Sequence, residues 1–597
     1  MKTTYLIGLL IGALLLNACQ ADMQNAKPVD LSKSFGQPAP GLTPAVFAPG
    51  VISLKGHTTG SITFNPEMTE LFFQRRKADE SHNIYTMKLI DGRWSEPALA
   101  PFSTNKEYLD FHPRLNATGD RLYFGSTRPL SENLDAAALE AWKSQRNFEK
   151  LNQWYVEKGE QGWGQPQLLL ADLLADRWVM CVSPANNGNL YFTSSERDAR
   201  LADEGIYYVE NQGGQYGSVE GLGASINGYG KWIAHPFIDP DEKYLIYDAE
   251  RTDIAENGDL YVSFNIDGEW TASYPLGPEI NTEKGEQGAT VSPDGKYLFY
   301  IGSGEDEETN YLYWVSTEVI DRWHPQHATT SPYQIARGAN GIGLSNAAGT
   351  LQMKLTQGDH GYPAWSPDGK KLAFYGYYDN GKTWSIHTIN RDGTGFKRIT
   401  HAKDKWDNMP AWSYDGSQLV FAREYPNADG VQQYELWTMN ADGSNQQQLT
   451  ALQGGGPRFM PDGRILYHSE YSDKESEISI ANPDGSNIIH LTDNEAEEWD
   501  AKLSPDGRQI VFTSKRDGNH EVYVMNVDGT DQRRLTNNDI DDYGPDWSPD
   551  GKQIVYQSKG EGAGEDAPSA LYIMNADGSG KRKVVAPGWQ PAWYNIR

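Results

Sequence analysis

Residues 364–374 read AWSPDGKKLAF, and close copies of this segment return through the second half of the chain. Each copy places two short alternating apolar runs around an Asp-Gly turn, in which glycine supplies the positive φ that such a turn needs. A unit that recurs at a steady interval predicts an array of hairpins. The other copies are AWSYDGSQLVF at 411–421, RFMPDGRILYH at 458–468, KLSPDGRQIVF at 502–512 and DWSPDGKQIVY at 546–556.

A second hairpin signal lies between these copies, first as TINRDGTGFKRIT at 388–400. Two hairpins per repeat give four antiparallel strands, which make one propeller blade. The alternating SPDGK and NADGS signatures resemble the WD40-like (PD40) repeats of TolB-type β-propellers. The resemblance implies a propeller fold but no particular activity, because propellers host many unrelated functions.

Looser versions of the repeat occupy the first half, such as HPRLNATGDRLYF at 112–124. Five inner hairpins are present there, and the segment 43–54 resembles an outer strand that has no blade of its own. We expect it to complete the fifth blade. In the second half, QPAWYNIR at 590–597 supplies the inner strand that 333–356 lacks, which makes a sixth blade. Closing both rings in this way removes exposed strand edges.

The chain is therefore predicted to be all-β, with two tandem β-propellers and a short helical insertion. The N-terminal propeller is five-bladed over residues 43–323. The C-terminal one is six-bladed and TolB-like over 333–597, and a linker at 324–332 joins them. The insertion at 131–159 has apolar residues at helical rather than alternating spacing. It is either a decorative loop or a lid or partner-binding element.

The N-terminus, MKTTYLIGLLIGALLLNAC, has the charge and apolar run of a signal peptide over residues 1–18. It resembles a bacterial lipobox, which implies that Cys19 becomes a lipidated N-terminus; the alternative is an ordinary secretory signal. Gln20 after the cysteine implies sorting to the outer membrane. Residues 19–42 are polar and contain prolines, so they read as a tether. We expect a cell-envelope lipoprotein, on the periplasmic or the cell-surface face, that touches the membrane through its lipid only.

Composition argues against nucleic acid as a partner, because the formal net charge is −29. The chain contains no GxSxG, HExxH, phosphate-loop or paired CxxC motif. These observations favour a non-catalytic binding scaffold for an envelope protein or a polysaccharide. The rival hypothesis is a carbohydrate-active enzyme, either a lyase acting on a uronic-acid polysaccharide or a glycosidase.

One candidate site is the funnel of the second propeller, where aligned positions are aromatic or acidic. Such a surface suits sugars, cationic peptide segments or a calcium ion. No metal or other cofactor is required. Alternatively, the aromatic rings fill space between blades and the acids are solvated. The candidate binding residues are His360, Tyr362, Trp406, Asp407, Trp499, Asp500, Asp542, Tyr543 and Trp589.

The other candidate site lies in the first propeller, where His112 and His235 occupy equivalent positions of two blades. Arginines that neutralise a carboxylate beside a histidine that moves a proton would suit a uronate lyase. Alternatively, the arginines belong to the repeat architecture and bond loop carbonyls. They follow the second strands of blades one to four and are Arg76, Arg128, Arg197 and Arg251.

The turn glycines also give an expectation. The inner-hairpin glycines should tolerate substitution least, and Gly349 should tolerate it best, because its repeat is degenerate. The inner glycines are Gly369, Gly416, Gly463, Gly507 and Gly551.

The lipid anchor is testable by Cys19→Ser. Because the thiol is the lipid acceptor, this variant should still be exported but should no longer fractionate with membranes. Fractionation and high-salt washing measure the outcome. A variant that stays with the outer membrane after the wash would show that the lipid is not the anchor.

Overall fold

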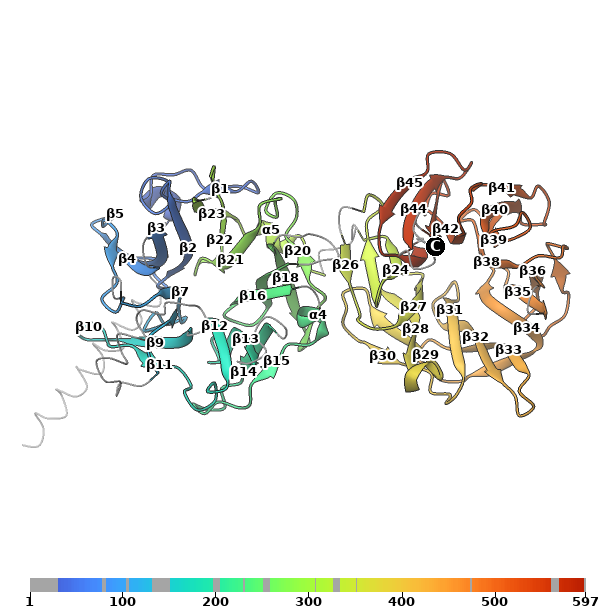
Figure 1. Cartoon of the computed structure of the whole chain (residues 1–597), viewed down its shortest axis with the longest axis horizontal. Coiled ribbons are helices and arrows are strands. Elements are labelled where there is room, and N and C mark those ends of the chain that lie inside the picture. Colours follow the sequence, from blue (N-terminus) through green and yellow to red (C-terminus); the bar gives the residue numbers. More distant parts are fainter. Residues whose placement is uncertain are drawn as a thin grey trace, which may run out of the picture. The chain divides into compact units, whose positions relative to one another are not determined.

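The computed structural model describes residues 30–77, 82–103, 107–130, 151–196, 204–228, 231–250, 258–306, 308–325, 333–349, 352–472, 475–559 and 569–594. These residues group into two compact units, one mainly before and one mainly after residue 327. In each unit, β-sheets stand around a central axis (Figure 1). The all-β propeller prediction is confirmed. Short helices are α2 (Leu31–Ser34), α4 (Ala224–Asn227), α5 (Glu318–Asp321) and the 3-10 turn η3 (Asp379–Gly381).

The first unit, called the first ring below, is built from blades of antiparallel strands, and one parallel pair, Thr58 opposite Asn310, joins two of the blades into a nine-stranded sheet. Blade one contains β2 (His57–Phe64), β3 (Glu70–Lys77), β4 (Asn83–Ile90), β5 (Arg93–Trp94) and β6 (Ala98–Leu99). Blade two contains β7 (Asp110–Leu115), β8 (Arg121–Ser126), β9 (Asn152–Gly159), β10 (Gly162–Trp163) and β11 (Gln167–Leu168). Blade three contains β12 (Arg177–Pro184), β13 (Leu190–Glu196), β14 (Gly205–Val209) and β15 (Glu220–Gly221). Blade four contains β16 (Lys231–Ile238), β17 (Tyr244–Glu250), β18 (Gly258–Ile266), β19 (Glu269–Trp270) and β20 (Tyr274–Pro275).

The next sheet of this ring joins the two ends of its sequence. It contains β21 (Glu286–Val291), β22 (Tyr297–Ser303), β23 (Asn310–Ser316) and β1 (Ala45–Val46). Ala45 pairs with Trp314 and Val46 with Tyr313. The predicted completion of this blade by segment 43–54 is therefore confirmed.

The second unit, called the second ring, repeats the same pattern. Its first blade contains β27 (His360–Trp365), β28 (Lys371–Tyr378), β29 (Thr383–Asn390) and β30 (Lys397–Arg398), and its second contains β31 (Trp406–Trp412), β32 (Gln418–Pro426), β33 (Gln432–Asn440) and the first part of β34 (Gln447–Phe459). The later part of β34 begins the third blade, which continues with β35 (Ile465–Ser472), β36 (Glu475–Ala481) and β37 (Ile489–His490). The fourth blade contains β38 (Glu498–Leu503), β39 (Gln509–Ser514), β40 (Glu521–Asn526) and β41 (Arg533–Arg534), and the fifth contains β42 (Asp542–Trp547), β43 (Gln553–Ser558), β44 (Ala570–Asn575) and β45 (Arg582–Val585).

The last sheet of the second ring again joins distant segments. The C-terminal strand β46 (Trp589–Trp593) pairs with β24 (Ile335–Gly338), and β25 (Ile342–Ser345) and β26 (Gln352–Lys354) follow outward. Ile335 lies opposite Trp593 and Ala336 opposite Ala592. The predicted completion of 333–356 by the C-terminal strand is confirmed as well.

Residues of the AWSPDG repeat form hydrogen bonds within their own hairpin and with the adjacent blade. Ser366 Oγ donates to Asp368 Oδ1 at 2.7 Å and accepts from the Lys371 amide at 2.9 Å, which fixes the turn. Trp412 Nε1 donates to the Ala364 carbonyl of the preceding blade at 3.1 Å. The repeat that reveals the fold in the sequence thus supplies bonds within and between blades.

Two expectations about flanking segments need correction. The described part of the predicted tether is packed, because Leu31 is fully buried and the Phe35 and Phe47 rings lie 4.9 Å apart. The prediction of a tether rested on the polar composition of the segment and did not consider its apolar residues Leu31 and Phe35. The last part of the predicted helical insertion is strand β9. Residues 131–150, the signal peptide and Cys19 lie outside the described residues.

The expectation for the turn glycines was wrong. Gly349 has φ 75°, and a Cβ there would lie 2.1 Å from the Val584 carbonyl oxygen of the neighbouring β45. Gly463 and Gly507 also have positive φ, but a Cβ on either would meet nothing within 4 Å. Degeneracy of the repeat therefore does not mean looseness, because the turn at Gly349 packs against backbone.

We expect Gly349→Ala to destabilise the second ring more than Gly507→Ala. The control variant adds left-handed strain only, worth about 1–2 kcal/mol. Gly349→Ala adds the same strain and a clash that backbone has to relieve. Urea unfolding of both variants measures the difference, and equal losses would contradict the packing of this turn.

Candidate functional site

A bulge in the innermost strand of most blades decides where the central side chains point. At each bulge one residue takes a left-handed conformation, and bulges are a common way to redirect a side chain. These residues, with φ between 47° and 66°, are His112, Cys181, His235, Gly288, Tyr362, Met409, Gly456, Asp500, Gly544 and Gln590.

The amide that a bulge releases from strand pairing is bonded by the preceding blade. Gln74 Oε1 accepts from the His112 amide at 3.0 Å, and Thr193 Oγ1 accepts from the His235 amide at 2.9 Å. Both acceptors lie on the second strand of their blade, β3 and β13 respectively. Each bulge is therefore fixed from outside its own sheet.

The structure brings the two predicted histidines together. The ring centroids of His112 and His235 lie 4.6 Å apart, although their strands belong to different blades. They line a cavity of about 710 Å³, which we call the histidine cavity. Its aromatic and apolar walls include Phe111, Trp178, Met180 and Trp232, and its polar walls include Arg76, His82, Glu204, Asp248, Glu250, Lys284 and Glu286.

His235 is oriented by a carboxylate. Its Nδ1 lies 3.0 Å from both oxygens of Asp248, which also accepts from the Gly288 amide at 2.9 Å. An ionised carboxylate only accepts hydrogen bonds, so Nδ1 carries the hydrogen in this pair. In the neutral ring, Nε2 then keeps its lone pair and can accept a proton.

Burial shifts the pKa of several other groups in the cavity in the direction that favours the neutral form. Burial, with smaller effects of the His235 and Arg114 charges, holds the pKa of His112 well below 6.5, and its Nδ1 lies 2.8 Å from Ser61 Oγ. Burial and then Arg76 lower the pKa of His82 to about 3. Burial raises the pKa of Glu286 to about 7, against the opposing effect of two bonds from Thr282.

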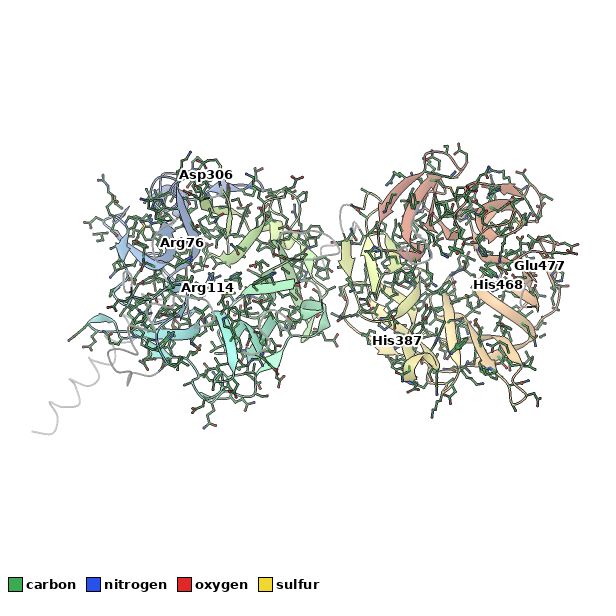
Figure 2. The ribbon with its side chains drawn as sticks, viewed as in Figure 1. Arg76, Arg114, Asp306, His387, His468 and Glu477 are labelled. Carbon is green, nitrogen blue, oxygen red and sulfur yellow. The ribbon has the colours of Figure 1, made fainter. Side chains whose placement is uncertain are left out.

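Arg76 supplies a cation to this neutral surface. It lies at the inner end of β3, lines the histidine cavity, and is shown in Figure 2. Among the described residues, its Nε has no hydrogen-bond partner. Lys284 contributes a second positive charge to the wall, and its Nζ contacts the Gly304 carbonyl at 3.3 Å.

Arg128 does not reach the cavity, which corrects its place among the catalytic candidates. It is buried in an ion pair with Asp110 and also donates to the Phe102 carbonyl. The second ring repeats this arrangement in Arg516 and Glu498, whose atoms approach to 2.8 Å. The pair is therefore repeat architecture, the alternative that the sequence left open. Arg197 and Arg251 lie outside the described residues.

The candidates of the second ring are dispersed rather than gathered. Asp407 and Asp542 are 0% exposed, so they do not line an open surface as expected. Asp407 pairs with Arg423 at 2.5 Å. Burial raises the pKa of Asp542 to about 6. Both acids lie at the start of an inner strand and are buried, whereas the neighbouring Trp406 and Tyr543 are only partly buried.

The aromatic candidates of the second ring form separate groups. Trp406 stacks on Trp384 at 5.2 Å, whereas Trp499 and Tyr543 enclose His520 at 4.9 and 5.0 Å. Tyr362 and Asp500 lie at bulges and are hydrogen-bonded to each other. His360 bonds Thr356 Oγ1, and Trp589 covers Gly338. These positions stay predictions for binding.

Sequence reasoning missed Asp248, Ser61 and Glu286. Asp248 could have been found, because it occupies on β17 the place that Thr193 occupies on β13. Within the described residues, no three or more His, Cys, Asp or Glu side chains are placed to hold a metal ion, so the calcium ion considered above gains no support there. The described helices include none that is long and apolar enough to cross a membrane.

Fold and site together define a double β-propeller whose first ring encloses a polar and aromatic cavity. Residues 422–594 match the model of the TolB β-propeller domain. For this part of the second ring, the resemblance read from the repeats is confirmed.

Two solved structures and one curated relative are similar to parts of this chain at low identity. TolB from Acinetobacter baumannii is 19% identical, with a TM-score of 0.39 over 51% of this chain and 81% of that chain. A putative TolB from Agrobacterium tumefaciens is 22% identical, with a TM-score of 0.35 over 42% and 89%. An uncharacterized protein of Agrobacterium fabrum is 26% identical over 225 residues, which are 34% of this chain and 74% of the relative.

Glu286 predicts a pH dependence of stability. Its pKa is about 7 in the folded protein against 4.5 ordinarily, so the folded state binds more protons between these values. The stabilisation is present below pH about 4.5 and is lost as the pH rises through about 7, by about 2–3 kcal/mol. Glu286→Gln should remove this loss, and Glu283→Gln, at an exposed position, should not. Urea unfolding across this range measures it. A wild-type slope that survives in Glu286→Gln would contradict the assignment.

Proposed function

We propose that the protein is a binding scaffold of the cell envelope that is held to the outer membrane through Cys19. Its ligand is an acidic glycan. The observation that carries the proposal is the histidine cavity of the first ring. A cavity of about 710 Å³ has the size of a small-molecule or oligosaccharide site rather than of a protein interface.

The walls of the cavity suit a sugar. Trp232, which is 44% exposed, offers an accessible aromatic surface, and Trp178 is a second aromatic wall. Sugars combine apolar ring faces with many hydroxyl groups, so they need aromatic contacts and hydrogen-bond partners in one place. The neutral His112 and His82 can exchange such bonds without the cost of desolvating a charge.

The charges in the cavity favour a sugar that carries a carboxylate. Arg76 lines the cavity, and a guanidinium binds carboxylates in a bidentate manner. Glu204 and Glu250 also line the cavity, and they favour hydroxyl donors over a densely charged polyanion. A uronic-acid oligosaccharide offers both kinds of group.

A second candidate function is that of a lyase, and the Asp248–His235 pair favours it. His235 Nε2 could take the proton beside the uronate carboxylate while Arg76 neutralises that carboxylate. The electrons of the C–H bond then form a carbon–carbon double bond, and the glycosidic C–O bond breaks. The leaving oxygen would take a proton from water. General-base catalysis requires a correctly held neutral base, and Asp248 holds one.

Calorimetry of the purified protein with uronate and neutral oligosaccharides tests both functions. Uronate oligosaccharides should bind, and Arg76→Met should weaken them about tenfold or more, since bonds to charged groups are lost. Arg75→Met is the matched control, because Arg75 lies over Tyr85 instead of lining the cavity. Loss of binding in Trp406→Ala but not in Arg76→Met would move the site to the second ring. Absence of any uronate binding would overturn the proposal.

Ultraviolet absorbance of the same mixtures separates binding from catalysis. Unsaturated products that form with the wild type and not with His235→Gln would establish the lyase. Binding without formation of unsaturated products would support the binding scaffold and contradict the lyase.

A further inference from the structure

The axis of the first ring contains a second cavity, distinct from the histidine cavity. Its volume is about 380 Å³, and it shares no lining residue with the histidine cavity. Two residues beyond each bulge, the innermost strands contribute a layer of side chains to its wall. These are Thr63, Arg114, Ser183, Phe237 and Thr290. We call it the arginine cavity.

Arg114 is a buried cation with weak partners. Its side chain belongs to a residue that is 2% exposed, and Figure 2 shows it in the inner part of the first ring. Nη2 donates to the Ala289 carbonyl at 2.8 Å, and Nη1 reaches the Ile62 carbonyl at only 3.5 Å. Among the described residues, Nε has no partner and no carboxylate forms an ion pair with this guanidinium.

The neighbouring thiol does not balance this charge. Cys181 contacts Arg114, but burial raises the pKa of the thiol to about 11, so it is neutral at physiological pH. Among the described residues, carbonyl oxygens and this neutral thiol are then the groups bonded to the cation. Such burial costs free energy unless a counter-charge is present.

The second ring carries an acid in the same layer. There the equivalent positions hold Arg458, Lys502 and Asp546, and the charged atoms of Lys502 and Asp546 lie 3.2 Å apart. The five equivalent positions of the first ring hold no acid, and the acids that line its cavity, Asp239 and Asp241, follow the end of β16.

Hydroxyl groups around Arg114 are ready to donate. Thr63 Oγ1 accepts from the Leu115 amide at 3.1 Å, and Ser183 Oγ accepts from the Ile238 amide at 3.0 Å. Both oxygens therefore use a lone pair on a backbone amide, and among the described residues neither O–H donates a hydrogen bond. A guanidinium flanked by free O–H groups is a set of donors without an acceptor.

We propose that the axis of the first ring binds a small monovalent anion of the size of chloride. Arg114 provides the charge, and Thr63 and Ser183 provide further donors. Asp239 and Asp241 also line the cavity and oppose larger or multiply charged anions, although Lys243 pairs with Asp241 at 2.8 Å. The anion completes the ring in the way that Asp546 completes the second.

Bromide diffraction tests the location. Crystals of the full-length mature chain grown in bromide should show an anomalous peak against Arg114 in the arginine cavity. A peak elsewhere only, or an adventitious surface ion only, would overturn the proposal.

Anion-dependent stability tests the binding in solution. When isethionate is exchanged for chloride at constant ionic strength, the melting temperature of the wild type should rise, because the anion binds the folded state. The apparent chloride affinity should fall about tenfold or more in Arg114→Met, since charge-assisted bonds are lost. Arg114→Lys should keep part of the response, and Arg76→Met should keep all of it. Equal responses of wild type and Arg114→Met would overturn the site. If Arg114→Met does not fold, the Lys variant and the bromide peak still decide.

Discussion

The amide that each inner bulge releases has to find an acceptor, because it lies inside the ring and away from water. For His112 and Gly288 that acceptor comes from the second strand of the blade before, from Gln74 and Asp248 respectively. Thr513 of the second ring bonds the Gly544 amide in the same way at 3.2 Å. In each of these cases the accepting side chain stabilises the left-handed backbone of the bulge and links two blades. It also determines where the side chain of the bulge residue points.

This constraint explains why structure and function meet in the same residues. Asp248 holds the Gly288 amide with the oxygen that also faces His235 Nδ1, so the orienting group of the histidine is part of the blade contact. A residue on a rigid strand holds its partner more firmly than one on a loop. The histidine cavity is thus built from the framework of the ring itself, without dependence on the outer loops for its floor.

Much of the fold could be predicted from the sequence, and the reason is physical. Apolar alternation and turn chemistry are local, so the repeats and both closing strands could be found from spacing, and alignment of repeats placed His112 and His235 at one level. The partner of each bulge amide changes from Gln to Thr to Asp, which leaves no recurring letter to align. The burial of Asp407 with Arg423 and the packing of Gly349 against Val584 depend on neighbouring blades, which local patterns do not specify.

The two rings solve the same problem of the axis differently, and this difference bears on function. The second ring places an acid in its axial layer, where Asp546 pairs with Lys502 beside the further cation Arg458. The first ring has no acid at the equivalent positions, and the charge of Arg114 is one of the effects that keep the pKa of His112 low. A buried charge without a counter-charge in the protein favours the binding of a ligand that supplies one. The first ring, whose sequence repeats are the more degenerate, is for this reason the ring in which a ligand completes the structure.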